Sequence, residues 1–241
     1  GGLHGVGASV VNALSSRLDV EVTRGSKVHK MSFRRGVPGR FDDSGGTPSP
    51  DSPFEEFHEA TGLEIVGKAK RGVTGTKVHY WADPQIFLGS AQFDYQHLVE
   101  RARQTAFLVP GLELTIVDRR GVARDETGEV IAERVEDFRF DGGITEFVDH
   151  LSIDPPITDT WRMQSTGSFK ETVPVLDSSG HLVSKEVERE VGVDVALRWG
   201  TGYDTKIKSF VNVVSTPHGG THLAGFEQAT LKAMRKAVEA N

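Results

Sequence analysis

Apolar residues recur at two spacings along this chain, and the changes from one spacing to the other mark predicted helices and strands. Apolar positions between Val10 and Leu18 follow the helical period, which predicts a helix with one buried face. Alternating apolar residues over 18–22 and 31–33 flank the turn residues 24–26, and they predict an antiparallel hairpin with one solvent-facing side.

The same two spacings continue through the first half of the chain. Strands are predicted over 63–66 and 73–81, and a helix follows Asp94, whose side chain suits an N-cap. Pro110-Gly111 ends this helix, and alternation over 112–116 predicts a further strand. This order predicts an α+β fold, in which helices back an antiparallel or mixed sheet.

A second series of elements is predicted after the polar stretch 119–136. It comprises a strand at Phe138 and Phe140, a helix over 144–151, a polar hairpin over 165–190 with a turn at 178–180, a strand over 193–199 that pairs with 207–214, and a helix over 223–238. We therefore place a domain boundary near Asp137, which gives domains of residues 1–136 and 137–241.

The segment 34–62 differs in composition from its surroundings. Between Arg34 and Pro53 it is rich in Gly, Pro, Ser and Asp and has too few apolar residues to bury its own surface. We therefore predict a mobile insertion in the form of an extended hairpin loop. Its acidic residues are interpreted as a solvated surface rather than as a partner-binding site.

Composition narrows the class of protein. The 241 residues are 37% hydrophobic and 26% charged, which is typical of a globular protein with one large or two modest cores. The formal net charge of −6 argues against a surface built mainly to hold DNA phosphates, so any DNA contact is expected to be local. The absence of cysteine excludes disulfides and thiolate metal sites and suits a reducing cytoplasm. No apolar run reaches the ~18 residues that a membrane span needs.

The first seven residues contain four glycines and lead directly into the first predicted helix. Glycines leave backbone N–H groups unshielded, and the first N–H groups of a helix lack intrahelical partners, so this arrangement favours an anion such as phosphate. Without other signals, such a stretch is more often only a tight turn. Two nucleotide-binding motifs do not fit: Val10 stands where the dinucleotide fingerprint needs a third glycine, and the P-loop lysine is missing before Lys27.

Three stretches carry a resemblance that covers nearly the whole chain. Gly2-Leu3-His4-Gly5-Val6-Gly7, followed by Ser9-Val10-Val11-Asn12-Ala13-Leu14-Ser15, resembles the glycine box of the ATPase subunit of bacterial type II DNA topoisomerases. Thr74-Gly75-Thr76 resembles the Thr-Gly-Thr strand of that family, and Gly219-Gly220-Thr221-His222 resembles a turn in its next domain. The family comprises the B subunits of DNA gyrase and topoisomerase IV, between which this region does not distinguish.

The resemblance implies a fold and a nucleotide site. Residues 1–136 are expected to be the C-terminal part of a GHKL-type ATPase sandwich, and residues 137–241 the N-terminal part of a ribosomal-S5-like α/β transducer domain. The implied ATP-binding residues lie in the glycine box and the Thr-Gly-Thr strand: Gly2, Leu3, His4, Gly5, Val6, Gly7, Ala8 and Thr76. The glycine box is expected to hold the phosphates, and Thr76 to hydrogen-bond in the adenine pocket, directly or through water. From spacing alone, Thr76 would be an ordinary β-branched strand residue. His4 either donates to a phosphate or packs in the lid over the nucleotide.

The resemblance also implies an activity for the parent protein. That protein is expected to act in the cytoplasm as a homodimer, together with the A subunit of the same topoisomerase, and to use ATP and Mg²⁺ to pass one DNA duplex through another, with no membrane partner. In this family the acidic general base and the Mg²⁺-binding asparagine precede the glycine box, and the phosphate-contacting lysine lies in a Gln-Thr-Lys motif that this chain lacks. We therefore expect a fragment without catalytic or metal-binding residues, inactive alone. Phosphate release at the rate of the intact protein would contradict this.

Alternative interpretations accompany this one. One is a non-catalytic GHKL nucleotide-binding clamp or a chaperone-like module, which would bind nucleotide without changing DNA topology. A metal site is suggested by the spacing of His218, His222 and Glu227, but Gly219-Gly220 between the histidines favours a turn and a helix start. Lys206 and Lys208 are expected to alternate on a strand face, and we interpret them as solvated surface rather than as DNA contacts.

Overall fold

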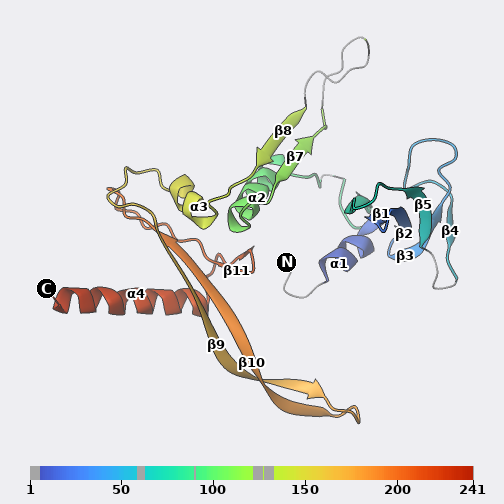
Figure 1. Cartoon of the computed structure of the whole chain (residues 1–241). Helices are drawn as coiled ribbons and strands as arrows, with labels where there is room; N and C mark the ends of the chain where they lie inside the picture. The colour runs from blue at the N-terminus through green and yellow to red at the C-terminus, as the bar shows by residue number, and fades with distance from the viewer. Residues whose placement is uncertain (1–5, 59–62, 90, 122–126, 128–132, 241) are drawn as a thin grey trace. The chain divides into compact units, whose positions relative to one another are not determined.

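The computed structural model describes residues 6–58, 63–89, 91–121, 127 and 133–240 (Figure 1). The chain forms two compact units, Gly1–Phe93 and Asp94–Asn241, which are described separately. The domain boundary predicted near Asp137 lies inside the second unit, within the strand β8 (Arg134–Phe138), and stays a prediction. None of the described helices is both long and apolar enough to cross a membrane.

The first unit is an antiparallel sheet preceded by one short helix. Its elements are α1 (Gly7–Ala13), β1 (Ser15–Arg24), β2 (Lys27–Arg34), β3 (Val37–Phe41), β4 (Phe54–Glu56), β5 (Glu64–Lys68) and β6 (Gly75–Ala82). The strand order is β4-β3-β2-β1-β6, and β5 also pairs with β2. The hairpin predicted over 18–33 is confirmed, as are the strands predicted over 63–66 and 73–81.

The strand register gives the sheet one apolar face and one polar face. Cross-strand partners share a face, because side chains alternate along each strand. Val20 lies opposite Met31 and Val78, so apolar side chains from three strands share one face. Asp19 lies opposite His79 on the other face, which carries the more polar set.

Residues 42–53, here called the 42–53 loop, are tied to the polar face of the sheet. Within the predicted insertion 34–62, β3 and β4 pair with each other, which agrees with the hairpin expected there, and the predicted mobility stays a prediction. Arg17 is fully buried, donates to both carboxylate oxygens of Asp43 at 2.7 and 2.6 Å, and donates to the Ser49 carbonyl at 2.8 Å. Charge pairing therefore holds a segment that has few apolar residues.

The first helix is shorter than the predicted one. α1 ends at Ala13, and Leu18 is a buried residue of β1 rather than part of a helical face. β1 pairs with β6 from Ser15 onward, and the Ser15 hydroxyl donates to the Val11 carbonyl at 2.6 Å, which satisfies an acceptor at the helix end. No residue of α1 is buried, so the prediction of a buried apolar face is wrong.

Two helices and a short strand pair begin the second unit. They are α2 (Tyr95–Leu108), β7 (Leu114–Asp118), β8 and α3 (Ile144–Leu151), and α2 contacts β7, β8 and α3. As predicted, Asp94 caps α2, because its carboxylate accepts a hydrogen bond from the His97 N–H at 3.0 Å. Phe107 of α2 is almost fully buried and stacks on Phe140, with ring centroids 3.5 Å apart. This contact joins the core of α2 and β8 to the chain that leads into α3.

A long hairpin follows in the second unit (Figure 1). β9 (Trp161–Leu176) pairs antiparallel with β10 (Leu182–Leu197) along the whole of both strands. The hairpin predicted over 165–190 is confirmed, but the pairing predicted between 193–199 and 207–214 is wrong. Within 207–214 the structure has β11 (Phe210–Val211), which pairs with the equally short β12 (Val214–Ser215).

The last element is the helix α4 (Thr221–Glu239), which confirms the helix predicted over 223–238. None of its residues is buried, so its apolar stripe does not face a core within the described chain. Taken together, antiparallel sheets and helices confirm the predicted α+β fold class.

Candidate functional site

The predicted nucleotide site falls partly outside the described residues. Gly2, Leu3, His4 and Gly5 lie outside them, whereas Val6, Gly7 and Ala8 form the start of α1. The helical turn closes with a hydrogen bond from the Val10 N–H to the Val6 carbonyl at 2.9 Å. The structure therefore describes the helix into which the glycine box leads.

The start of α1 has the features that an anion requires. Val6 occupies the N-cap position without a side-chain cap, so the following backbone N–H groups have no acceptor within the helix. Residues 6–10 are exposed, and no described heavy atom beyond the chain neighbours and the backbone of α1 lies within 4 Å of the position that a Cβ would take at Gly7. A negatively charged group can therefore approach these N–H groups closely, and the helix dipole favours it.

Thr76 lies on β6, on the apolar face of the sheet. It stands opposite Val22, shares this face with Val78, and is exposed. β6 meets the end of α1 near Ala82, six residues further along the strand, which is about 20 Å at ~3.3 Å per residue. Within the described chain no hydrogen bond joins Thr76 to residues 6–8, so the two parts of the predicted site are separate parts of one unit.

Sequence reasoning missed a junction at the other end of α1, built around Asp83. The Asp83 N–H donates to the Leu14 carbonyl at 3.0 Å, and the Asp83 side chain is 2% exposed. Arg35 Nε donates to Asp83 Oδ2 at 2.6 Å, and the Gln85 N–H donates to Oδ1 at 2.9 Å. The hydrogen bond from Arg35, followed by that from Gln85, lowers the pKa of Asp83, so this carboxylate is charged at neutral pH.

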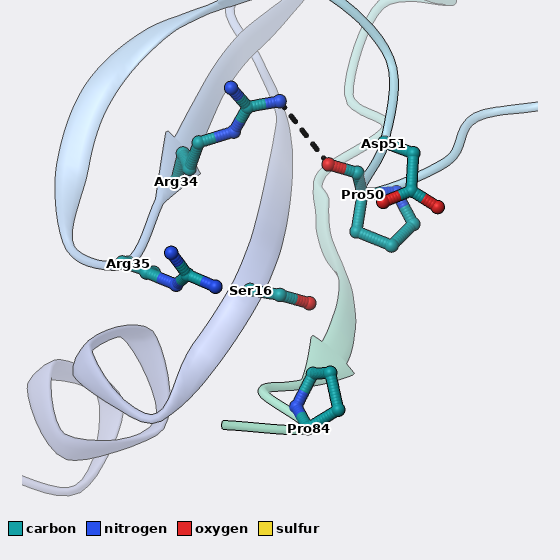
Figure 2. Close-up of a pocket in the computed structure, with 6 residues that line it drawn as sticks. All are labelled: Ser16, Arg34, Arg35, Pro50, Asp51 and Pro84. Carbon is teal, nitrogen blue, oxygen red and sulfur yellow. Dashed lines mark hydrogen bonds between the residues drawn. The ribbon is translucent and has the colours of Figure 1, made fainter. Parts of the chain in front are cut away.

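A hollow of about 420 Å³ opens beside this junction (Figure 2). It is lined by Ser16, Arg34, Arg35, Pro50, Asp51 and Pro84. Arg34 donates to the carbonyls of Pro50 and Ser52, at 3.2 and 2.7 Å, and Figure 2 shows the Arg35 guanidinium pointing toward Ser16. Both guanidinium groups already have acceptors on the protein, so the hollow is a seam between the sheet and the 42–53 loop rather than an open anion site.

The other candidate residues have structural roles. Among the described residues, no three His, Cys, Asp or Glu side chains come together as a metal site. His222 lies in the first turn of α4 with its Nε2 3.2 Å from Thr216 Oγ1, and Gly219 and Gly220 form the turn before it, as the preferred interpretation states. Lys206 and Lys208 lie in a non-strand segment, so their predicted alternation on a strand is wrong.

Comparisons with known proteins link the chain to one group of proteins. Residues 143–241 match the family model described as DNA gyrase B. The chain is 37% identical over 227 residues to the B subunit of DNA gyrase from Halalkalibacterium halodurans, covering 94% of this chain and 28% of that protein. It is 35% identical over 237 residues to the B subunit of DNA gyrase from Borrelia hermsii, covering 98% of this chain and 29% of that protein.

A solved structure is similar along the same length. It is the crystal structure of the 43K ATPase domain of Thermus thermophilus gyrase B in complex with an aminocoumarin, with 30% identity and a TM-score of 0.66. The match covers 99% of this chain and 52% of that one. The chain spans less than a third of the length of the two full relatives.

Proposed function

We propose that the chain belongs to the DNA gyrase B family and is part of the ATP-binding subunit of a bacterial type II DNA topoisomerase. In this proposal the parent enzyme uses ATP binding and hydrolysis to pass one DNA duplex through another. The observation that carries it is the match of almost the whole chain to gyrase B proteins at up to 37% identity. Identity at this level over more than 220 residues supports a shared activity as well as a shared fold.

The glycine box and Thr76 are the proposed nucleotide-binding residues. Gly2, Leu3, His4, Gly5, Val6, Gly7 and Ala8 hold the triphosphate through main-chain N–H groups, and Thr76 hydrogen-bonds in the adenine pocket. Two observations support this assignment: the start of α1 is uncapped and exposed, and the Thr76 hydroxyl lies on an exposed apolar sheet face that suits a purine ring.

ATP supplies the phosphoanhydride bond that is broken. The residues of this chain position the phosphates and stabilise their negative charge. Backbone N–H groups at α1 orient the phosphates and stabilise their negative charge, which is the main task of a protein in phosphoryl transfer. The Mg²⁺-binding asparagine and the acidic general base of the parent protein are proposed to precede the glycine box, as the family resemblance implies.

We also propose the partners and the domain assignment that the family suggests. Residues 137–241 form the start of the transducer domain, which is supported by a family match that begins at residue 143. The full-length protein pairs with a second copy through its ATPase region, works with the A subunit of the same topoisomerase on DNA, and acts in the cytoplasm.

The topological activity is tested with the full-length protein, the A subunit of its enzyme and relaxed circular DNA. We expect a change of linking number that requires hydrolysable ATP. Nucleotide-dependent clamping without any topological change would contradict the proposal and support a binding-only GHKL module.

The phosphate site is tested by adding a side chain at Gly7 in the full-length protein. Because a Cβ meets no described atom there, and because Ala is a better helix former than Gly, Gly7→Ala leaves stability unchanged or raises it by up to about 1 kcal/mol. We expect weaker binding of a non-hydrolysable ATP analogue by Gly7→Ala, and still weaker binding by Gly7→Val. Gly45→Ala, at an equally open glycine in the 42–53 loop, is the matched control. Unchanged affinity in both Gly7 variants would contradict this assignment.

A further inference from the structure

Among the described residues, the contacts that hold α1 lie at its C-terminal end. None of its residues is buried, and its start carries no side-chain cap. Its C-terminal end is fixed by two main-chain hydrogen bonds, from the Asp83 N–H to the Leu14 carbonyl at 3.0 Å and from the Arg35 N–H to the Ser15 carbonyl at 3.2 Å. The direction of α1 therefore depends on the residues at this junction.

The turn that contacts this end has an unusual backbone. Arg35 and Gly36 join β2 to β3 with φ values of 50° and 84°, so both residues are left-handed, as in a two-residue hairpin turn of type I′. Glycine adopts this conformation freely, but a long side chain such as arginine rarely does. A Cβ at Gly36 would lie 3.9 Å from Ala13 Cα, so the turn packs against the last residue of α1.

The contact of the Arg35 side chain explains why an arginine occupies this left-handed turn position. The guanidinium donates to Asp83 Oδ2 at 2.6 Å, from a turn that is 48 residues away in the sequence. Asp83 is almost completely buried, whereas the Arg35 side chain is half-exposed. A buried carboxylate without a cation is costly, so the pair fixes the strand end that bonds to Leu14.

Asn12 Oδ1, in the last turn of the helix, is a buried acceptor without a hydrogen-bond partner among the described residues. An unsatisfied buried acceptor disfavours the arrangement in which it occurs. Since no residue of α1 is buried, its direction within the described chain depends mainly on the bonds at its C-terminal end.

We propose that Arg35 and Asp83 are positioning residues for nucleotide binding, which hold the end of α1 and thereby aim its first-turn N–H groups at the triphosphate. This inference rests on the proposed function. α1 has seven residues and is about 10 Å long, so a tilt of about 10° at its C-terminal end moves its first N–H groups by nearly 2 Å. A displacement of that size is enough to weaken hydrogen bonds to a bound phosphate.

The test compares two ligands in the full-length protein. Arg35→Ala, Asp83→Asn and the double variant are titrated with a non-hydrolysable ATP analogue and with adenosine, which lacks phosphates. We expect each single variant to bind the ATP analogue about 5-fold more weakly or worse, and to bind adenosine as the wild type does. We expect the double variant to lose no more than the larger single loss, since the two residues act through one contact. Arg40→Ala, which removes an exposed ion pair with Glu64 in the same sheet, is the matched control and is expected to bind both ligands normally.

Three outcomes would overturn the inference. If the wild type binds the ATP analogue and all three variants match it, the positioning role is wrong while the proposed function stands. An equal loss for the ATP analogue and adenosine would show general damage to the sheet rather than a misdirected α1. Failure of the wild type to bind the ATP analogue would overturn the proposed function and this inference together.

Discussion

Arg17 is the residue on which the position of the 42–53 loop depends. It has no exposed surface, and its guanidinium donates to Asp19, Asp43 and the Ser49 carbonyl. Its Cζ lies 4.0 and 5.2 Å from the ring centroids of Phe41 and Trp81. A buried guanidinium is tolerated when its donors are paired in this way. Asp19 is two residues from Arg17 and could be anticipated as a neighbour. Asp43 is 26 residues away, in a segment whose composition predicts only a loop, so local sequence gives no sign of the pairing.

The Arg17–Asp43 pair is expected to make stability depend on pH. Hydrogen bonds from Arg17 outweigh the effect of burial and lower the pKa of Asp43 from 3.8 to about 2. A lowered pKa in the folded state stabilises the fold above pH 4, and this contribution is lost as the pH falls from about 4 to 2. At pH 7, Asp43→Asn is expected to lower the free energy of unfolding by about 1–3 kcal/mol.

The check is thermal unfolding of the wild type and Asp43→Asn at pH 7 and near pH 2. The difference between their midpoints is expected to shrink in acid. A difference that stays constant down to pH 2 would mean that the charge of Asp43 does not act through Arg17.

A substitution at Thr76 is expected to weaken ATP binding without changing the stability of the fold. Thr76→Val keeps the shape of the side chain and removes its hydroxyl, and the residue is exposed, so the free energy of unfolding is expected to change by less than about 0.5 kcal/mol. Loss of one hydrogen bond in the proposed adenine pocket is expected to weaken ATP binding about 5-fold. Calorimetric titration of the full-length protein with a non-hydrolysable ATP analogue measures this, and equal affinities would remove Thr76 from the site.

Whether the sequence predicts an element correctly depends on how much apolar surface that element buries. α2 was predictable because Asp94 caps it and Val99, Ala102 and Ala106 face a core. β9 is exposed along nearly all its length, so the sequence predicted only the inner part of its hairpin, 165–190, and assigned a different partner to the end of β10. The glycine run correctly indicated the start of α1. The only sign of the Arg35–Asp83 junction in the sequence is Arg35-Gly36, a pair that suits a hairpin turn. Nothing local indicates the contact with Asp83.

The cap of α2 can be tested directly. Asp94→Ala removes the acceptor for the His97 N–H and is expected to lower the free energy of unfolding of the second unit by about 1 kcal/mol. Asp94→Asn keeps an acceptor at the same position and is expected to retain most of the stability. Denaturant unfolding measures both variants, and equal losses would show that the charge, rather than the hydrogen bond, is what matters.

For the molecule as a whole, net charge limits contact with DNA. A formal charge of −6 opposes non-specific attraction to phosphates, which requires clustered cations and weakens with salt. We expect the 241-residue chain to show no binding to a short duplex tighter than about 1 µM at physiological salt. Fluorescence anisotropy of a labelled duplex measures this. Tighter binding would reveal a cationic surface that the composition conceals.

The β9–β10 hairpin gives the second unit a mechanical property that its small core does not suggest. Each strand has 16 residues, so at about 3.3 Å per residue the ribbon reaches about 50 Å from its root near Trp161. At that length, rotation of the root by only about 10° carries the tip through roughly 9 Å. Angular changes too small to disturb side-chain packing at the root are thereby amplified into nanometre travel at the far end.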